Sequence, residues 1–144
     1  SHRSDRYGAL LFLDLDNFKP LNDTHGHGIG DLLLIEVANR LKTCVREADT
    51  VARFGGDEFV VLLCDLDHDK DEAITQAGSI AEKIRQTLSM PYWLDSSIEH
   101  RCTASIGATL FKGRDTNEKD LIDAADTAMY QAKENGRNAI RFCP

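Results

Sequence analysis

The spacing of hydrophobic residues along this chain of 144 residues changes several times, and each change predicts an element of secondary structure. A continuous apolar run is typical of a buried strand, whereas apolar residues three and four positions apart indicate the buried stripe of a helix. The predicted strands are 8–13, which is expected to be the central one, and 50–54, 58–64, 101–111 and 139–142. The predicted helices are 29–45, 72–88 and 118–134, with a short helix or turn at 17–25 and a small hairpin within 91–99. This order predicts an α+β domain in which helices cover a mostly antiparallel sheet.

The segment 101–111 alternates apolar residues with small or polar ones, which predicts a strand that is buried on one face only. Its small residues Ser105 and Gly107 would let a ligand or a metal site approach the backbone closely. Core packing explains the same two residues equally well.

Two further expectations concern Trp93 and the ends of the last helix. Trp93, in the small hairpin, is expected to be a packing residue. The last helix is expected to begin at an N-cap of Asp115 or Thr116 and to end in a left-handed cap at 135–136, where the chain reads Asn-Gly.

The strands at 50–54 and 58–64 are joined by Gly55 and Gly56, which predict a tight hairpin because such a reversal favours the positive φ that glycine adopts freely. Two acids, Asp57 and Glu58, follow directly. Successive side chains alternate across a sheet, so at least one of these carboxylates is expected to lie over the hairpin surface. Alone, these four residues are equally consistent with a polar hairpin tip.

A second acidic stretch lies at 11–16, where an apolar run ends in Asp14 and Asp16. This is the pattern of a buried strand that delivers a carboxylate to the rim of a sheet. One acid from each of two strands can bind a hard cation of the magnesium type, which takes oxygen ligands and shares them with substrate phosphates. The two stretches together predict a two-metal site for phosphoryl transfer.

The composition limits the alternatives. With 42% hydrophobic and 28% charged residues the chain is that of one globular domain, and no apolar run approaches the ~20 residues of a membrane span. A formal net charge of −7 argues against nonspecific binding to DNA or RNA, which requires basic side chains. The four cysteines are widely spaced, which is typical of reduced thiols in a cytoplasmic protein.

Three blocks of sequence give a more specific indication. Residues 55–59 read Gly-Gly-Asp-Glu-Phe, residues 14–31 begin Asp-Leu-Asp-Asn-Phe-Lys, and residues 124–138 end Ala-Lys-Glu-Asn-Gly-Arg-Asn. In this order the blocks resemble the GGDEF family of diguanylate cyclases. The resemblance implies one domain over 1–144 with a ferredoxin-like core similar to the nucleotide cyclases and the polymerase palm. It also implies that the chain begins after the helix and Leu-Thr-Gly-Leu-type segment that family members carry upstream.

The resemblance further implies a reaction. Two GTP molecules would condense to cyclic di-GMP and two pyrophosphates, with Mg²⁺ or Mn²⁺ as the cofactor, two ions per active site. Each domain would hold one GTP, so that a homodimer is needed for catalysis. The implied roles are: metal binding by Asp14, the Leu15 carbonyl and Asp57; catalysis by Asp57 and Glu58; substrate binding by Asn17, Phe18, Lys19, Asn22, His27, Asp31, Lys133 and Arg137; and product inhibition by Arg46 and Asp49.

Some of these residues have a simpler explanation. Phe18 is also expected to anchor the core, Lys133 and Arg137 would complement a helix dipole, and Arg46 with Asp49 would form a salt bridge at a helix end. The function has alternatives as well. One is a catalytically silent domain that binds GTP or cyclic di-GMP and controls an attached EAL phosphodiesterase domain, since 138–144 resembles the junction into such a domain. Another is a purely structural dimerisation domain.

For the full-length protein we expect fusion to sensory or EAL domains. We expect this domain itself to be cytoplasmic, and the sequence leaves open whether the full-length protein is anchored in a membrane.

Overall fold

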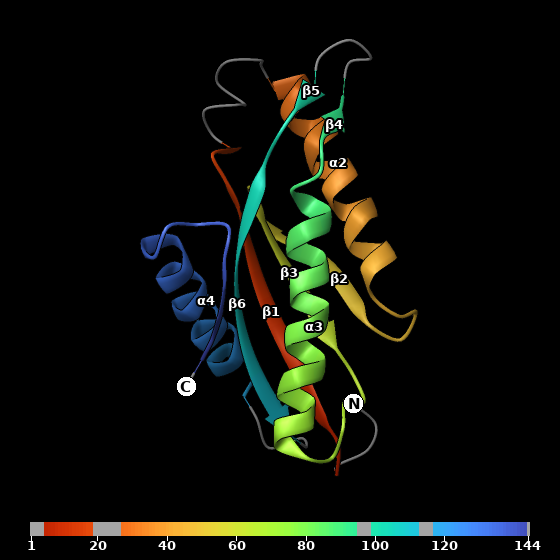
Figure 1. Ribbon diagram of the computed structural model, residues 1–144, viewed down its shortest axis with the longest axis vertical. Helices are drawn as coiled ribbons and strands as arrows, with labels where there is room; N and C mark the ends of the chain where they lie inside the picture. The colour runs from red at the N-terminus through yellow and green to blue at the C-terminus, as the bar shows by residue number, and fades with distance from the viewer. Residues whose placement is uncertain (1–4, 19–26, 95–98, 113–116, 144) are drawn as a thin grey trace.

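A five-stranded sheet forms the centre of the computed structural model, which describes residues 5–18, 27–94, 99–112 and 117–143 (Figure 1). The strands are β1 (Tyr7–Asp16), β2 (Thr50–Gly55), β3 (Glu58–Leu63), β6 (Thr103–Lys112) and β7 (Ile140–Phe142). Their order across the sheet is β2-β3-β1-β6-β7, and only the β6–β7 pair is parallel. The central position predicted for the first strand and the mostly antiparallel α+β sheet are confirmed.

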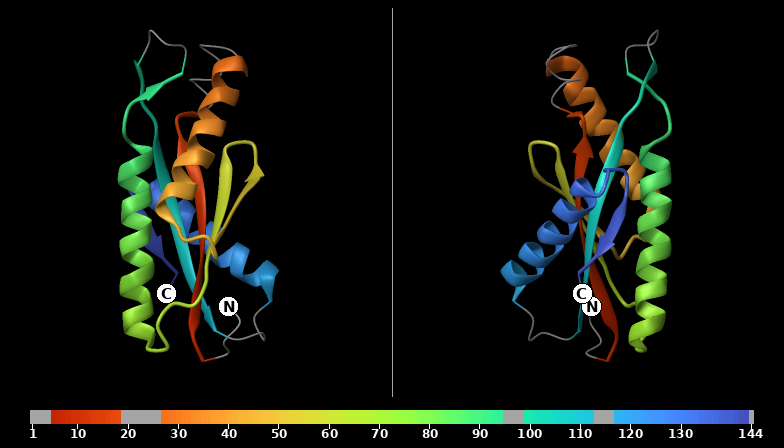
Figure 2. Two further views of the ribbon diagram at one scale, coloured as in Figure 1. Left: turned by 90° about the vertical axis from the view of Figure 1, so that its right-hand side faces the viewer. Right: turned by 60° about the vertical axis from the view of Figure 1, so that its left-hand side comes forward.

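The helices cover both faces of the sheet. They are α2 (His27–Cys44), α3 (Lys70–Leu88) and α4 (Glu118–Glu134), and a separate small hairpin joins β4 (Tyr92–Trp93) to β5 (Glu99–His100). Figure 2 shows α3 on one side of the sheet and α4 on the other, and Figure 1 shows α2 beside α3. All three predicted helices are therefore present, with ends that differ by up to two residues. No helix in the described ranges is long and apolar enough to span a membrane.

Strand β1 separates two cores because its side chains alternate between the faces of the sheet. Its odd-numbered residues from Ala9 to Leu15 belong to the larger core, together with side chains of α2 and α3. Leu10 and Phe12 point to the other face and pack with Ala125 and Met129 of α4. Asp14 and Asp16 continue this second row, so the period of the strand directs both carboxylates toward the α4 face.

The burial of β6 differs from the sequence prediction. This strand is buried along most of its length on both faces, and not on one face only, because α3 packs on one side of it and α4 on the other. Gly107 shows the reason for a small residue here: a Cβ atom at this position would collide with the Ala125 carbonyl oxygen and the Met129 amide nitrogen. Close packing of α4, and not the approach of a ligand, therefore accounts for this glycine.

Three other expectations are corrected. A tight turn joins β2 to β3 as predicted, but its two residues are Gly56 and Asp57, because Gly55 still belongs to β2 and pairs with Glu58. Neither glycine has a positive φ, and the register shifts between Arg53 and Gly55. The N-cap of α4 is Asn117, whose side chain accepts a hydrogen bond from the Lys119 amide. Trp93 is 63% exposed and is not a core packing residue, because side chains alternate along β4 and its neighbour Tyr92 takes the buried position.

Candidate active site

The predicted carboxylates meet at one end of the central strands. In the antiparallel register of β1 and β3, Asp14 lies directly beside Glu58, so both side chains lie on the α4 face of the sheet. The hairpin turn folds back onto β1, where the Leu15 amide donates a hydrogen bond of 3.1 Å to the Asp57 carbonyl oxygen. A residue from one strand and two from a hairpin more than forty positions later in the chain are thereby gathered into one acidic cluster.

Asp14 is the most perturbed acid of this cluster. Its side chain is only 18% exposed, and its Oδ1 atom is buried without a hydrogen-bond partner. Burial, followed by the negative charge of Asp57, raises the pKa of Asp14 to about 7, although Lys133 acts in the opposite direction. Such a carboxylate is costly to keep in its charged form unless a cation binds to it.

Glu58 is perturbed in the same direction. Burial is the main cause that raises the pKa of Glu58, and the negative charges of Asp126 and Asp57 add to it. Burial is the largest cause for both acids, and repulsion from Asp57 adds to it in each case; a divalent cation would relieve that repulsion.

The donor set fits magnesium or manganese bound together with a substrate. Carboxylate oxygens are the preferred ligands of these hard cations, and the orphaned Oδ1 of Asp14 is such an oxygen. Within the described residues, however, no group of three or more His, Cys, Asp and Glu side chains is arranged to hold an ion by itself. Mg²⁺ commonly takes one or two protein carboxylates and completes its shell with water and substrate phosphates. The cluster therefore fits that mode better than a site built from protein ligands alone.

Helix α4 places the ammonium group of Lys133 beside the acidic cluster. Lys133 lies one turn after Met129 on the side of α4 that faces the sheet. Its Nζ atom lies 3.0 Å from Oδ1 of Asp16 and 3.8 Å from Oδ1 of Asp14. The predicted substrate-binding lysine is thus placed at the edge of the cluster, with a partly buried ammonium group.

Asp16 is a site residue to which the sequence prediction gave no role. It is 1% exposed, and it accepts hydrogen bonds from the hydroxyls of Thr103 and Ser105, from Lys133 and from the Asn138 amide. Burial raises the pKa of Asp16, but these hydrogen bonds outweigh that effect and hold it below its usual value. The available sequence signal was the period of β1, which places Asp16 on the same face as Asp14.

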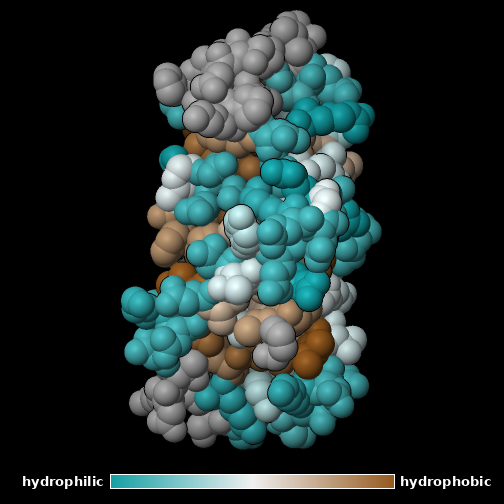
Figure 3. All heavy atoms as spheres, turned by 90° about the vertical axis from the view of Figure 1, so that its left-hand side faces the viewer, coloured by the Kyte–Doolittle hydropathy of each residue, from teal (hydrophilic) through white to brown (hydrophobic). Residues whose placement is uncertain are grey.

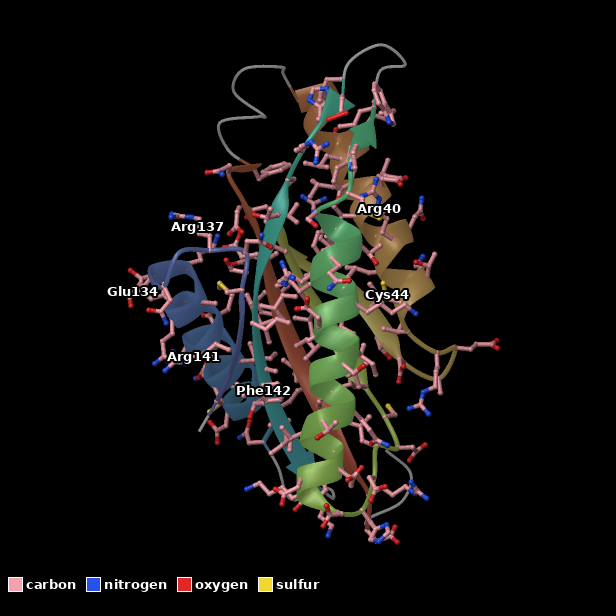
Figure 4. The ribbon with its side chains drawn as sticks, viewed as in Figure 1. Arg40, Cys44, Glu134, Arg137, Arg141 and Phe142 are labelled. Atoms are coloured by element: carbon pink, nitrogen blue, oxygen red, sulfur yellow. The ribbon has the colours of Figure 1, made fainter. Side chains whose placement is uncertain are left out.

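The turn after α4 carries the second predicted phosphate ligand. Gly136, Arg137 and Asn138 all have positive φ, at 114°, 64° and 47°, which is uncommon for the two residues that are not glycine. Amides of the turn bond back to α4, from Gly136 to the Lys133 carbonyl and from Arg137 to the Ala132 carbonyl. The Arg137 side chain is exposed and projects from this turn (Figure 4). Hydrophilic side chains cover most of this face of the molecule (Figure 3).

The residues predicted to bind the base and the remaining phosphates are only partly described. Asp31 is exposed on α2 and lines a cavity of ≈ 510 Å³ together with Arg53 and Phe59. Asn17 is exposed with a φ of 61°, and Phe18 packs against the larger core, as its alternative explanation predicted. Lys19, Asn22 and the side chain of His27 lie outside the described residues.

The predicted inhibitory pair lies elsewhere, in the loop between α2 and β2. The Asp49 carboxylate is fully buried and accepts hydrogen bonds from the amides of Arg46 and Cys64, at 2.9 and 3.0 Å. Arg46 is 57% exposed and donates from its guanidinium to the Cys64 carbonyl oxygen. The pair therefore forms the local ion pair of the simpler explanation, and Arg46 also borders an open cavity of ≈ 570 Å³.

Comparison with known families agrees with the motifs. The family model described as diguanylate cyclase, GGDEF domain, matches residues 1–139. A bifunctional diguanylate cyclase/cyclic di-GMP phosphodiesterase of Pseudomonas aeruginosa, MucR, is 47% identical over 140 residues, which are 97% of this chain and 19% of MucR. Diguanylate cyclase A of Treponema denticola is 37% identical over 132 residues, which are 92% of this chain and 34% of that protein. The chain thus spans about a third or less of these relatives.

The fold has a similar solved counterpart. The crystal structure of the GGDEF domain of YfiN from Pseudomonas aeruginosa superposes with a TM-score of 0.88 at 36% sequence identity. The match covers 96% of this chain and 83% of that one. The palm-like α+β architecture expected from the motifs is therefore confirmed by an experimental structure as well as by the strand order.

Proposed function

The chain belongs to the diguanylate cyclase GGDEF family, and from this premise we propose that it condenses two GTP molecules into cyclic di-GMP and two pyrophosphates. The observation that carries the proposal is the buried, unpartnered Oδ1 of Asp14 in a cluster of acids that Lys133 adjoins. Carboxylates that repel one another beside a cation are suited to a metal-bound triphosphate, because the metal neutralises the acids and the lysine can bind a phosphate.

In this proposal Asp14, Asp57 and the Leu15 carbonyl hold Mg²⁺ or Mn²⁺, two ions per site. When bound, the ions lower the pKa of the attacking 3′-hydroxyl and neutralise charge on the leaving pyrophosphate. Asp57 accepts the proton of that hydroxyl, and Glu58 assists at the metal. The Leu15 amide already bonds to the Asp57 carbonyl, so the two segments that supply the ligands are joined directly.

Other residues bind the nucleotide. Lys133 and Arg137 bind the terminal phosphates, and the amides of 17–19 cradle the β- and γ-phosphates. Asn22 and Asp31 read the guanine edge, since an amide and a carboxylate can pair with its acceptor and donors. His27 lies beside the substrate. The cavity of ≈ 510 Å³ beside Asp31 supports a base-binding position between α2 and β2.

The proposed reaction needs two copies of the domain. One site holds one GTP and supplies no second nucleotide to attack it, so two chains must face each other in antiparallel orientation. Turnover per chain should then rise with protein concentration. A specific activity that is constant over a wide dilution series would contradict this part of the proposal.

We also propose that cyclic di-GMP inhibits the enzyme through Arg46 and Asp49. A guanidinium can bind a phosphate or the Hoogsteen edge of guanine. Arg46 is exposed beside an open cavity, which supports this role. Asp49 is committed to two backbone amides, so its participation requires the loop to rearrange.

A second candidate is a silent regulatory domain that binds GTP or cyclic di-GMP and controls an attached phosphodiesterase. It is favoured by NbdA of Pseudomonas aeruginosa, which is 39% identical over 134 residues and is named for the cyclic di-GMP phosphodiesterase activity alone. In that case Asp31 and Lys133 bind nucleotide without turnover.

One experiment separates the two candidates. The purified domain at high concentration is incubated with GTP and Mg²⁺, and cyclic di-GMP and pyrophosphate are followed by chromatography, with Asp57→Ala as the control. The cyclase proposal expects product that Asp57→Ala abolishes. Magnesium-dependent GTP binding without product would support the regulatory candidate, and the absence of both would overturn both.

A further inference from the structure

The two aspartates at the end of β1, Asp14 and Asp16, differ in how their carboxylates are hydrogen-bonded. Asp14 has a buried oxygen without a hydrogen-bond partner, whereas Asp16 accepts four hydrogen bonds, two on each oxygen. The two hydroxyl donors, Thr103 at 2.6 Å and Ser105 at 2.8 Å, come from the neighbouring strand β6. A carboxylate has about four lone-pair positions, so those of Asp16 are all in use. It has no oxygen left for a metal ion.

The other two donors come from the end of α4. Lys133 donates to Oδ1 of Asp16 at 3.0 Å, and the Asn138 amide donates to Oδ2 at 3.0 Å. A free lysine side chain loses conformational entropy when it is ordered. Because Asp16 is itself fixed by Thr103 and Ser105, it orders Lys133 before any ligand arrives.

The same carboxylate fixes the turn after α4. The amide of Asn138 follows two residues with positive φ, a conformation that persists only when surrounding contacts hold it. One such contact is Asp16, and another is the hydrogen bond from Arg85 to the Asn138 side chain. Arg137 projects from this turn, so its position also depends on the anchor (Figure 4).

We propose that Asp16 is a positioning residue that holds Lys133 and the turn 136–138 in place to bind the phosphates of a nucleoside triphosphate, and that it is not a metal ligand. This inference rests on the proposed function, because the phosphates are those of the GTP in that proposal. Its contribution is to binding of the triphosphate, while guanine recognition on α2 and metal binding at Asp14 do not depend on it.

The test compares GTP with GMP, which has the same base and lacks the terminal phosphates. Binding of each is measured by calorimetry with Mg²⁺ for wild type, Asp16→Asn, Lys133→Met and the double variant. Asp16→Asn should reduce the preference for GTP over GMP about tenfold, the equivalent of one charge-assisted hydrogen bond. Lys133→Met should do the same. The double variant should lose less than the product of the two single losses, since Asp16 acts in part through Lys133 and in part through the turn that carries Arg137.

A matched control is present on α4. Lys119 and Asp123 form an exposed ion pair at 3.4 Å on the same helix. Lys119→Met and Asp123→Asn should leave the preference unchanged. Magnesium dependence separates the two aspartates further: GTP binding should remain magnesium-dependent in Asp16→Asn and lose that dependence in Asp14→Asn.

Several results would overturn the inference. Equal losses for GTP and GMP would show a general structural defect, and loss of magnesium dependence in Asp16→Asn would make it a metal ligand. Tighter GTP binding in Asp16→Asn would mean that Asp16 competes with phosphate for Lys133. If Asp16→Asn does not fold, Thr103→Val removes one anchor of the carboxylate and should lower the preference about threefold; no change in that variant would also overturn the inference.

These outcomes are distinct from failure of the proposed function. A wild-type domain that prefers GTP but makes no cyclic di-GMP would refute the cyclase and leave the test of Asp16 intact. Product formation with an unaltered GTP preference in Asp16→Asn would refute the role of Asp16 alone. A wild-type domain without any preference for GTP over GMP would refute both.

Discussion

The acidic cluster at Asp14 and the loop that holds Arg46 and Asp49 both contain buried carboxylates, but they satisfy them differently. Both oxygens of Asp49 accept backbone hydrogen bonds, one from Arg46 within its own loop and one from Cys64 directly after β3. Oδ1 of Asp14 has no hydrogen-bond partner, and burial together with the negative charge of Asp57 raises the pKa of this residue. Since buried polar groups are normally paired, an unpaired one indicates an absent ligand, whereas a fully paired one holds the fold and must be released before it can bind anything. The first region is organised for a ligand and the second for stability.

The largest expected effect comes from removing the charge of the unpaired acid. Asp14→Asn should reduce cyclic di-GMP formation by about 10³-fold or more, because it removes a metal ligand that acts in the transition state. The same change should raise the stability of the metal-free domain by about 1 kcal/mol, because functional sites often store such repulsion. Initial rates and thermal unfolding of both proteins test this, with Asp123→Asn as a matched control. A variant that is both inactive and less stable would contradict the account of Asp14 as a strained carboxylate.

At Asp49, the acid whose oxygens are both paired, we expect a loss of stability and not a gain. Asp49→Ala should lower the free energy of unfolding by about 2–3 kcal/mol, because it leaves the amides of Arg46 and Cys64 without their partner. Urea denaturation measures the loss. A change below about 0.5 kcal/mol would mean that the hydrogen bonds of this loop do not stabilise it.

The acidic cluster should also respond to pH through Asp14. The pKa of Asp14 is raised from its ordinary value of 3.8 to about 7, so magnesium-dependent GTP binding should strengthen up to about tenfold between pH 6 and pH 8 as this group loses its proton. In the absence of metal the sign is reversed. The folded state holds this proton more tightly than the unfolded state, so the contribution of Asp14 to stability falls as pH rises from about 4 to 7. A GTP affinity that does not change over pH 6 to 8 would contradict the raised pKa.

The smallest expected effect is that of Arg46→Ala. Its guanidinium is largely exposed, so the loss of its ion pair should cost about 1 kcal/mol or less. The informative measurement is cyclase activity against added cyclic di-GMP. Inhibition should be weaker in the variant while the uninhibited rate stays the same. Unchanged inhibition would reduce the Arg46–Asp49 pair to a structural role.

Much of this fold could be predicted from the chain because the apolar periods are clear. The helices, the central strand and the glycine hairpin follow from spacing alone. Strand β1 is longer than its apolar run, however, since it continues through Asp14 to Asp16. It continues because hydrogen-bond donors from β6, from α4 and from the turn after α4 pair with the Asp16 carboxylate. A local sequence pattern cannot predict contacts with residues 87 to 122 positions away.

The errors have similar causes. The β6 strand was expected to be buried on one face because its second face carries small residues, but those residues admit α4 to the sheet. Trp93 was expected to pack, but the alternation of side chains along β4 buries its neighbour Tyr92 and leaves Trp93 exposed. At the site, the motifs identified Asp14, Asp57, Glu58 and Lys133 as a group. They gave no role to Asp16, because the role proposed for it depends on its contacts with residues far away in the chain, which no motif shows.

The central claim is that the unpaired oxygen of Asp14 binds a divalent cation together with a nucleoside triphosphate. The most direct measurement is anomalous diffraction from Mn²⁺ in crystals grown with a nonhydrolysable GTP analogue. We expect a peak about 2 Å from Oδ1 of Asp14, close to the Leu15 carbonyl and Asp57, with Asp16 still bound to Lys133. A nucleotide-bound structure in which Mn²⁺ contacts Asp16 and leaves Asp14 without a ligand would contradict the account.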